Sequence, residues 1–332
     1  MHMAMRGLID TFSAIFRHER PQGDLEHAAF LAEMTERVVV TASPKIRAVR
    51  GYHKRLLPAL DSSSKYFAES IRHFPGPVTL AKQTWNSDPL VNACFASVEQ
   101  LEVFLRGNAD IREAASRTDS REVYFLLTMN RREEVVYGSA MVGEMIRRDV
   151  PQEVVTFSDH RCVAPGLTIH ETKQQLNRLA LELLASLASA SILETRKRLE
   201  DLERERTSLG YELKILKLKD QGLGSALTRH GEVEKELAEG GMIQEELDAE
   251  ITRLKSAFSD LEDYLRLVES IFSHPESMLR FEDMTLEVNR KGVKNYTGID
   301  DPSRPIHFAQ FSTSERSRAA FLAVSPVEEI IA

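Results

Sequence analysis

A long stretch without proline most constrains what this chain can fold into. No proline lies between Pro165 and Pro275, and no glycine lies between Gly166 and Gly210. Proline breaks helices and glycine weakens them, so their absence over this length favours long continuous helices. From Thr168 onward the stretch therefore predicts helix rather than sheet.

Apolar residues in this stretch follow the alternating spacing of three and four that is typical of a coiled-coil seam. In the first arm these positions are Ile192, Leu199, Leu202, Leu209, Leu213 and Leu216, with Thr195 and Arg206 interrupting them. In the second arm they are Leu247, Ile251, Leu254, Phe258, Leu261, Leu265, Val268 and Phe272. The spacing predicts that these faces hold two helices together.

Glycines at 222, 224, 231, 240 and 241 separate the two arms and predict a turn region over about 220–241. An antiparallel hairpin over 167–275 is the simplest interpretation, and a parallel dimer of single long helices is the competing one. The second arm is acidic, with 12 Asp and Glu against 4 Lys and Arg over 232–269. At the tip, the residues expected to contact a partner are Leu223, Leu227, Arg229 and His230.

The segments on either side of the hairpin have different periodicities. Residues 21–120 predict a helical region with helices over 24–42, 45–73 and 87–107, the second interrupted at Pro58. Residues 121–166 are rich in Val, Tyr, Phe and Thr and predict an antiparallel β meander of three strands with a polar turn at Arg131 and Arg132.

β character returns over 276–332. Residues 284–296 alternate and contain a Lys-Gly turn signal, while 306–313 and 318–326 predict a hairpin joined through Ser314, Glu315 and Arg316. We expect the strands before and after the helical hairpin to share one sheet. The predicted fold class is therefore α+β: an N-terminal helical region and an antiparallel β base, with a long coiled-coil helical hairpin inserted between β segments.

Composition excludes several classes of protein. The formal net charge is −8 among 332 residues, which gives no global electrostatic case for nucleic-acid binding. The two cysteines, Cys94 and Cys162, make no disulfide framework or CxxC zinc site. No run of 18 apolar residues and no signal-peptide pattern occurs, so the expected location is the cytoplasm.

The stretch TFSDHRCVAPG, residues 156–166, has the composition of an active site. A thiol nucleophile at Cys162 would need a base such as His160 beside it. On a regular strand His160 and Cys162 share one face, while Asp159 and Arg161 lie on the other with Phe157. Asp159 then cannot orient His160, so a half-buried strand end leading into the long helix is the preferred interpretation.

Two other segments could bind partners. The densest basic patch comprises Lys45, Arg47, Arg50, Lys54 and Arg55. Its preferred interpretation is a solvated helix face, and the alternatives are a contact with phosphates or with an acidic surface, including the chain's own acidic arm. Residues 5–18 can form an amphipathic helix, which would dock on the protein's own core or lie on a membrane surface.

No phosphate-binding glycine loop, dinucleotide fingerprint, HExxH or GxSxG motif is present. An amphipathic N-terminus with a helical hairpin is loosely similar to membrane-remodelling proteins of the phage-shock type. A hairpin between β blocks also looks like the periplasmic adaptors of efflux systems. The segment order differs from the first and the expected location from the second, so neither resemblance implies a function here.

The sequence favours a non-enzymatic interaction or scaffold protein with no cofactor, no metal and no small-molecule substrate. Its partner would be another protein or a second copy of itself. The alternatives are a membrane-surface protein that uses residues 5–18, and an enzyme or nucleic-acid factor with a site in the helical or β region.

Overall fold

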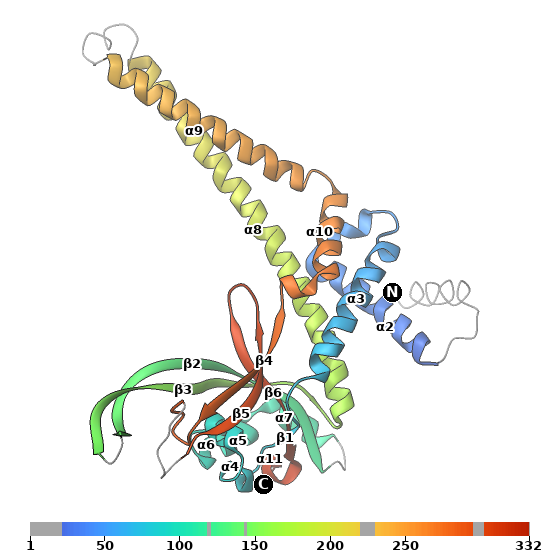
Figure 1. The fold of residues 1–332 in the computed structure, drawn as a ribbon. Coiled ribbons are helices and arrows are strands. Elements are labelled where there is room, and N and C mark those ends of the chain that lie inside the picture. Colours follow the sequence, from blue (N-terminus) through green and yellow to red (C-terminus); the bar gives the residue numbers. More distant parts are fainter. Residues whose placement is uncertain (1–21, 118–120, 143–144, 220–229, 295–301, 332) are drawn as a thin grey trace.

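The computed structural model describes residues 22–117, 121–142, 145–219, 230–294 and 302–331. It consists of a mixed α and β body from which two helices project as a long stalk (Figure 1). The helices, in chain order, are α2 (Gln22–Ala42), η1 (Pro44–Ala48), α3 (Tyr52–Arg72), α4 (Lys82–Trp85), α5 (Pro89–Cys94), α6 (Val98–Gly107), α7 (Ala109–Ser116), α8 (Ile169–Lys219), α9 (His230–Ala257), α10 (Leu261–Ser273), η3 (Pro275–Ser277) and α11 (Val327–Ile331).

The strands before and after the helical hairpin form one sheet, as expected. The strand order is β3-β2-β6-β5-β4, all antiparallel, and the short β1 pairs in parallel with β6. Their bounds are β1 (Val78–Thr79), β2 (Glu122–Val142), β3 (Met145–Gly166), β4 (Arg280–Val288), β5 (Arg304–Ser312) and β6 (Ser317–Pro326). The α+β fold class is thus confirmed, with α8, α9 and α10 inserted between β3 and β4.

Helices cover both faces of the sheet, and the alternation of side chains along each strand supplies both cores. In β6, Ala320 and Leu322 pack in the core that α2, α3, α8 and α10 form. Phe321 and Ala323 point the other way, into the core that contains α5, α6 and α7. Because both faces of β6 are buried, residues 319–324 of that strand form a continuous apolar run.

The expected three-strand meander over 122–163 is wrong in its turns. β2 runs unbroken from Glu122 to Val142 and pairs with β3 as a single long hairpin. Arg131 and Arg132 lie inside β2, opposite Phe157 and Thr156. A two-arginine sequence lacks the glycine or asparagine that tight hairpin turns need, so cross-strand pairing continues through it.

The expected helix over 87–107 is two helices. Asp88 caps α5 by accepting from the backbone N–H of Leu90 and Val91, and Ser97 caps α6 by accepting from Gln100. The Ser97 cap competes with helix continuation, so the chain turns at Phe95 and starts again. Pro58, in contrast, lies inside a single helix, α3, and does not interrupt it.

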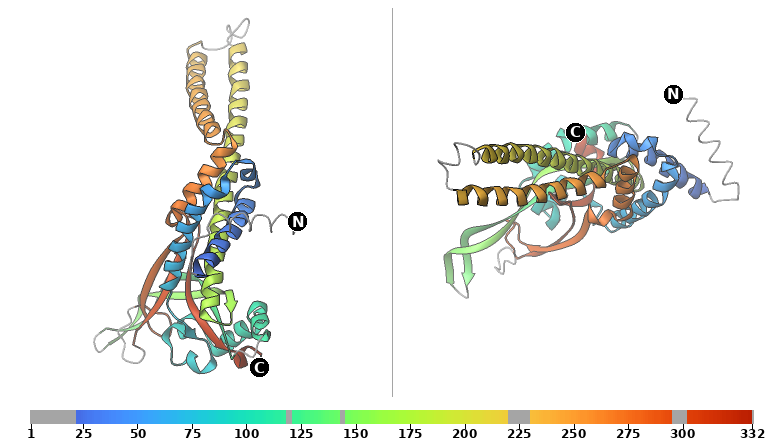
Figure 2. Two further views of the ribbon diagram at one scale, coloured as in Figure 1. Left: turned by 90° about the vertical axis from the view of Figure 1, so that its right-hand side faces the viewer. Right: turned by 90° about the horizontal axis from the view of Figure 1, so that it is seen from above.

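α8 is one helix of 51 residues, roughly 75 Å long at 1.5 Å per residue. Its first half packs in the body, where Leu181, Leu184 and Ala188 are fully buried. Its second half leaves the body and pairs with α9 to form the stalk (Figures 1 and 2).

The second arm of the hairpin is not one helix, which differs from the expectation of an unbroken seam. Helix α9 ends at Ala257 and α10 begins at Leu261. Asp260 caps α10 and exchanges hydrogen bonds with Asp263, forming a capping box that starts a new helix. Heptad spacing does not detect this break, because Phe258 and Leu261 are apolar as a seam requires.

The turn between the arms is also shorter than expected. Gly231, Gly240 and Gly241 lie inside α9 rather than in a turn. A methyl group at Gly240 would overlap the side chain of Leu213 on α8, whereas one at Gly241 would meet nothing. Gly240 is therefore a point of close approach between the arms, which explains one glycine that sequence reasoning assigned to a loop.

Candidate functional site

The cluster around His160 contains a bulge that reverses the expected faces of β3. Asp159 has a positive φ of 52°, and the pairing register with β2 shifts between Thr128 and Asn130. One extra residue flips the alternation beyond it. Consequently Phe157 and His160 pack in the same core, and the expectation that they lie on opposite faces is wrong.

His160 is held between helices rather than beside an acid. Its ring stacks on Phe95 at 4.6 Å, and its Nε2 lies 2.8 Å from the carbonyl oxygen of Cys94. Burial lowers the pKa of His160, and the hydrogen bond to Cys94 only partly opposes this. Neutral imidazole is therefore the favoured form, and its role is to tie β3 to the end of α5.

The other members of the cluster point elsewhere. The carboxylate of Asp159 binds Arg318 at 2.8 Å and Arg161 at 3.0 Å, and hydrogen bonds from these guanidiniums lower its pKa. Burial raises the pKa of the Cys162 thiol, so a thiolate is disfavoured there. The structure thus brings His160 and Cys162 to one face but does not supply the acid–base–thiol relay of a nucleophile.

The basic patch meets acidic residues of the chain itself. Arg47 pairs with Glu36 of α2 at 2.9 Å, and Glu36 also accepts a hydrogen bond from the hydroxyl of Tyr52. Partial burial and this hydrogen bond raise the pKa of Tyr52 to about 12. Lys45 lies over the ring of Tyr264 at 5.6 Å from its centroid.

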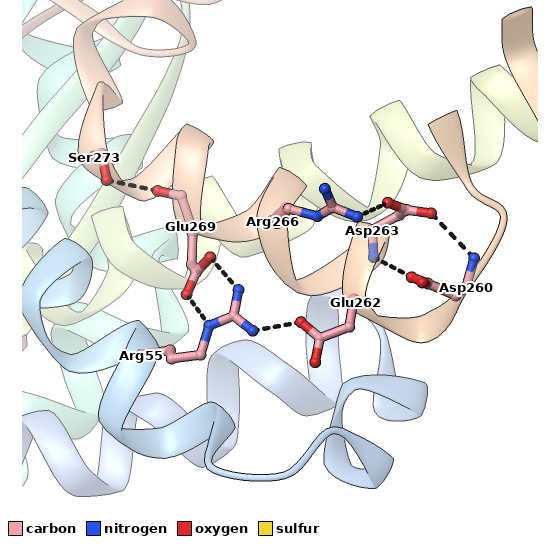
Figure 3. Close-up of polar contacts among 7 residues, drawn as sticks. All are labelled: Arg55, Asp260, Glu262, Asp263, Arg266, Glu269 and Ser273. Atoms are coloured by element: carbon pink, nitrogen blue, oxygen red, sulfur yellow. Dashed lines mark hydrogen bonds and ion pairs between the residues drawn. The ribbon is translucent and has the colours of Figure 1, made fainter. Parts of the chain in front are cut away.

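Arg55 makes the strongest contact of the patch, shown in Figure 3. Its Nε and Nη2 donate to the two carboxylate oxygens of Glu269, each at 2.9 Å, and its Nη1 donates to Glu262. These hydrogen bonds raise the pKa of Arg55. The two-carboxylate clamp joins α3 to α10 at the root of the stalk. Arg55 therefore binds the acidic second arm and is not available to bind phosphates. Arg50 and Lys54 remain exposed.

The expected seam residues divide between two places. Leu247 and Ile251 are buried against Leu202 of α8, with Leu199, Leu209 and Leu254 around them. Leu265, Val268 and Phe272 instead pack in the body core, while Leu261 is 38% exposed.

Ion pairs across the stalk join basic α8 residues to acidic α9 residues. Arg198 meets Glu250 at 3.2 Å, and Arg206 meets Asp248 at 3.3 Å. In the opposite sense, Lys255 of α9 meets Glu203 at 2.7 Å. Each pair is solvent-exposed and adds little stability. Together they favour one register of the two arms.

The far end of the stalk carries large apolar residues that are exposed on both of its helices. These residues, here called the distal surface, are Tyr211, Ile215, Leu218, Met242 and Ile243, with exposed fractions between 47% and 66%. Sequence reasoning missed them because it followed only the face that holds the arms together. The signal was present: Tyr211, Ile215 and Leu218 are spaced by four and three, which puts them on one side of α8.

The structure does not describe the side chains of the residues expected to contact a partner at the tip. Leu223, Leu227 and Arg229 lie outside the described residues, and His230 begins α9 without a described side chain. Residues 5–18 also lie outside them.

A hollow of about 690 Å³ lies in the body between α2, α3 and α8. Its walls include His27, Phe30, Asn177 and Arg178. The side-chain oxygen of Asn177 is buried without a hydrogen-bond partner. Phe30 is the one apolar residue among those that line the hollow, which is half open and lacks the enclosed apolar wall that small-molecule sites usually have.

Among the described residues, no group of three His, Cys, Asp or Glu side chains is placed to hold a metal ion. In the same residues, one helix segment, Ile169–Leu218, contains a window long and apolar enough to cross a membrane, a third of it buried inside the body. A buried core helix passes the same test, so the finding decides little.

Comparisons with protein-family models, curated proteins and solved structures found no match for this chain. The assignment of a function therefore rests on the geometry of the chain itself.

Proposed function

We propose that this chain is an interaction protein that presents the α8–α9 stalk to a protein partner. The observation that carries the proposal is the distal surface. Isolated apolar residues on a surface are ordinary, but here five large ones are exposed near the end of a two-helix projection, and Tyr211, Ile215 and Leu218 lie on one side of α8. Binding a partner would bury them.

The architecture supports this proposal over an enzymatic one. Two helices that project from the body add length to the molecule, and two pockets found among the described residues are lined by residues of the body. Its root is secured twice, by the buried residues of α10 and by the Arg55 clamp, so a partner bound at the far end is held at a defined distance from the body.

Site-specific photo-crosslinking in the native cell tests the proposal. A photoreactive residue at position 211 or 243 should yield a covalent adduct heavier than the chain. The same residue in place of the exposed Glu205, which lies on α8 but outside the distal surface, is the matched control. Adducts no more abundant at 211 and 243 than at 205 would refute the stalk as the contact element.

A membrane-surface role is separated by liposome flotation of the full chain and of a variant without residues 5–18. Flotation that depends on those residues, together with no adduct from the distal surface, would favour the membrane role instead.

A further inference from the structure

An exposed stripe runs along α8 on the side that faces away from α9. It starts at Leu179, since Thr172 and Leu176 before it on the same side are still buried, and ends with Leu218. The lower part contains Leu179, Leu183 and Leu193, which are 38–61% exposed. We refer to the face from 179 to 218 as the outer stripe.

The outer stripe has three parts. The part nearer the body contains the three leucines with Ser186 and Ala190. The part nearer the tip contains Tyr211, Ile215 and Leu218 of the distal surface. Between them the stripe is charged, with Lys197, Asp201 and Arg204. Successive members are three or four residues apart, except for a step of seven from Arg204 to Tyr211, so all lie on one side of the helix. Along the stripe the segments are apolar, charged and apolar, so their order is the same in both directions.

This near-symmetry makes the stripe complementary to itself. A two-fold axis crossing α8 at the level of Leu199 would run two copies of the helix antiparallel. Leu179 of one copy would then lie at the level of Leu218 of the other, and Leu183 at the level of Ile215. Each apolar part would cover the other, as a two-fold symmetric interface requires.

The charged middle supports the same arrangement. In this register Lys197 faces Asp201 of the second copy, and Glu194 lies at the level of Arg204. A parallel, in-register pair would instead bring Lys197 to Lys197 and Arg204 to Arg204, and facing like charges oppose pairing. The antiparallel register therefore satisfies the charged middle and the apolar positions at the two ends, while Leu193 lies at the level of Arg204.

The stripe is large enough for a specific contact. The residues from Leu179 to Leu218 span about 60 Å of helix, and a helix is about 10 Å wide. The contact would bury roughly 600 Å² on each copy, or about 1,200 Å² in total, which reaches the lower bound of stable protein interfaces.

We infer that the outer stripe of α8 binds a second copy of this chain, antiparallel, with each stalk lying along the other copy's helix. The inference rests on the proposed function and identifies the protein partner of the stalk as a second copy of the chain. It also accounts for the lower leucines, which lie on the body-proximal half of α8 and are not part of the distal surface.

The mass of the full-length chain in solution is the first test. Sedimentation equilibrium should give a dimer. Leu183→Glu and Ile215→Glu should each weaken dimerisation by tenfold or more, because each would bury a carboxylate opposite an apolar residue. Lys214→Glu, exposed at the same height but off the stripe, should leave it unchanged. Circular dichroism checks that each variant is folded.

The orientation is tested by disulfide formation between two differently labelled chains. A chain with Ser186→Cys, mixed with a chain with Tyr211→Cys, should cross-link under mild oxidation, and neither should cross-link alone. The unsubstituted chain, with Cys94 and Cys162, controls for native thiols. Self-cross-linking at 186 would indicate a parallel pair and overturn the inference.

A charge exchange gives a third readout. Lys197→Asp or Asp201→Lys alone should weaken the dimer, and the two together should restore it. A chain that stays monomeric at every concentration would overturn the inference. If that monomer still forms adducts with a different protein from position 211, the stalk function stands and only the second copy fails.

Discussion

At the residue scale, small local features override the patterns around them. The positive φ of Asp159 inserts one residue into β3 and turns His160 into the core, where its ring stacks on Phe95. Arg318 holds the bulge by donating to the carboxylate and to the carbonyl oxygen of Asp159. A cluster with the composition of an active site is thereby used to join a strand to a helix.

Protonation of His160 should destabilise the fold at acidic pH. Burial lowers its pKa in the folded state below the ordinary value of about 6.5. Below that value the unfolded chain binds the proton first, so the free energy of unfolding should fall as the pH drops. His160→Gln keeps a donor for the Cys94 carbonyl and does not titrate.

Urea unfolding between pH 7.5 and 5.5 measures this effect. The wild type should lose more stability over that range than His160→Gln does. His73→Gln, a substitution at an exposed histidine, should keep the wild-type pH dependence because His160 is still present. Parallel curves for the wild type and His160→Gln would contradict the prediction.

Two adjacent glycines in α9 should respond differently to the same substitution. Gly241→Ala adds a methyl group into open space and should stabilise the helix by about 0.5–1 kcal/mol. Gly240→Ala gains the same propensity but pushes against Leu213, so its net gain should be smaller or negative. Hydrogen exchange of the α9 amides measures both. Equal protection in the two variants would mean that the arms do not approach closely there.

At the element scale, helix ends decide how the second arm is used. The Asp260 capping box divides it into α9, which extends the stalk, and α10, which packs in the body. The Arg55 clamp then ties α10 to α3 through Glu262 and Glu269. The stalk is therefore connected to the body by α10, whose position is fixed both by its packing in the core and by the Arg55 clamp.

Replacing the arginine of the clamp should loosen this root. Arg55→Lys keeps the charge but cannot donate two parallel hydrogen bonds to Glu269. Because the pair is partly exposed, the expected loss is roughly 0.5–1 kcal/mol in the free energy of unfolding. Arg50→Lys, at an exposed arginine of the same basic patch, is the control and should be neutral. A double-mutant cycle with Glu269→Gln should show coupling, and additive losses would argue against the clamp.

At the scale of the whole molecule, the body and the distal stalk draw their stability from different contacts. The two large cores hold residues from the sheet and from the helices on its faces, whereas the stalk has its own small cluster around Leu202. The sheet is completed by β4, β5 and β6, which follow the whole hairpin in the sequence, and β6 pairs with β2.

Shortening the stalk should therefore leave the body folded. Replacing residues 211–241 with a four-residue turn keeps Leu202, Leu209 and Leu247, and should not change the thermal midpoint of the body. Leu265→Ala, within the body core, should lower stability by about 2–5 kcal/mol. Near-ultraviolet circular dichroism follows both variants. A truncated chain that no longer melts cooperatively would show that the stalk is part of the core.

Much of the architecture follows from the sequence alone, because it depends on local periodicity. The proline-free stretch determined the long helices, and alternation and turn residues determined the β5–β6 hairpin. The shared sheet followed from where the two β-rich blocks lie. Local pattern also identified the acidic character of the second arm.

Only the tertiary structure decided which of several compatible faces each residue uses. The bulge at Asp159 and the placement of Gly240 depend on neighbours that are distant in sequence, Arg318 and Leu213, and the packing of α10 depends on α3. The outer stripe of α8 illustrates the same limit, since both sides of the helix carry apolar residues at helical spacing. Periodicity marks a face as apolar, but which apolar face remains exposed depends on what the rest of the chain covers.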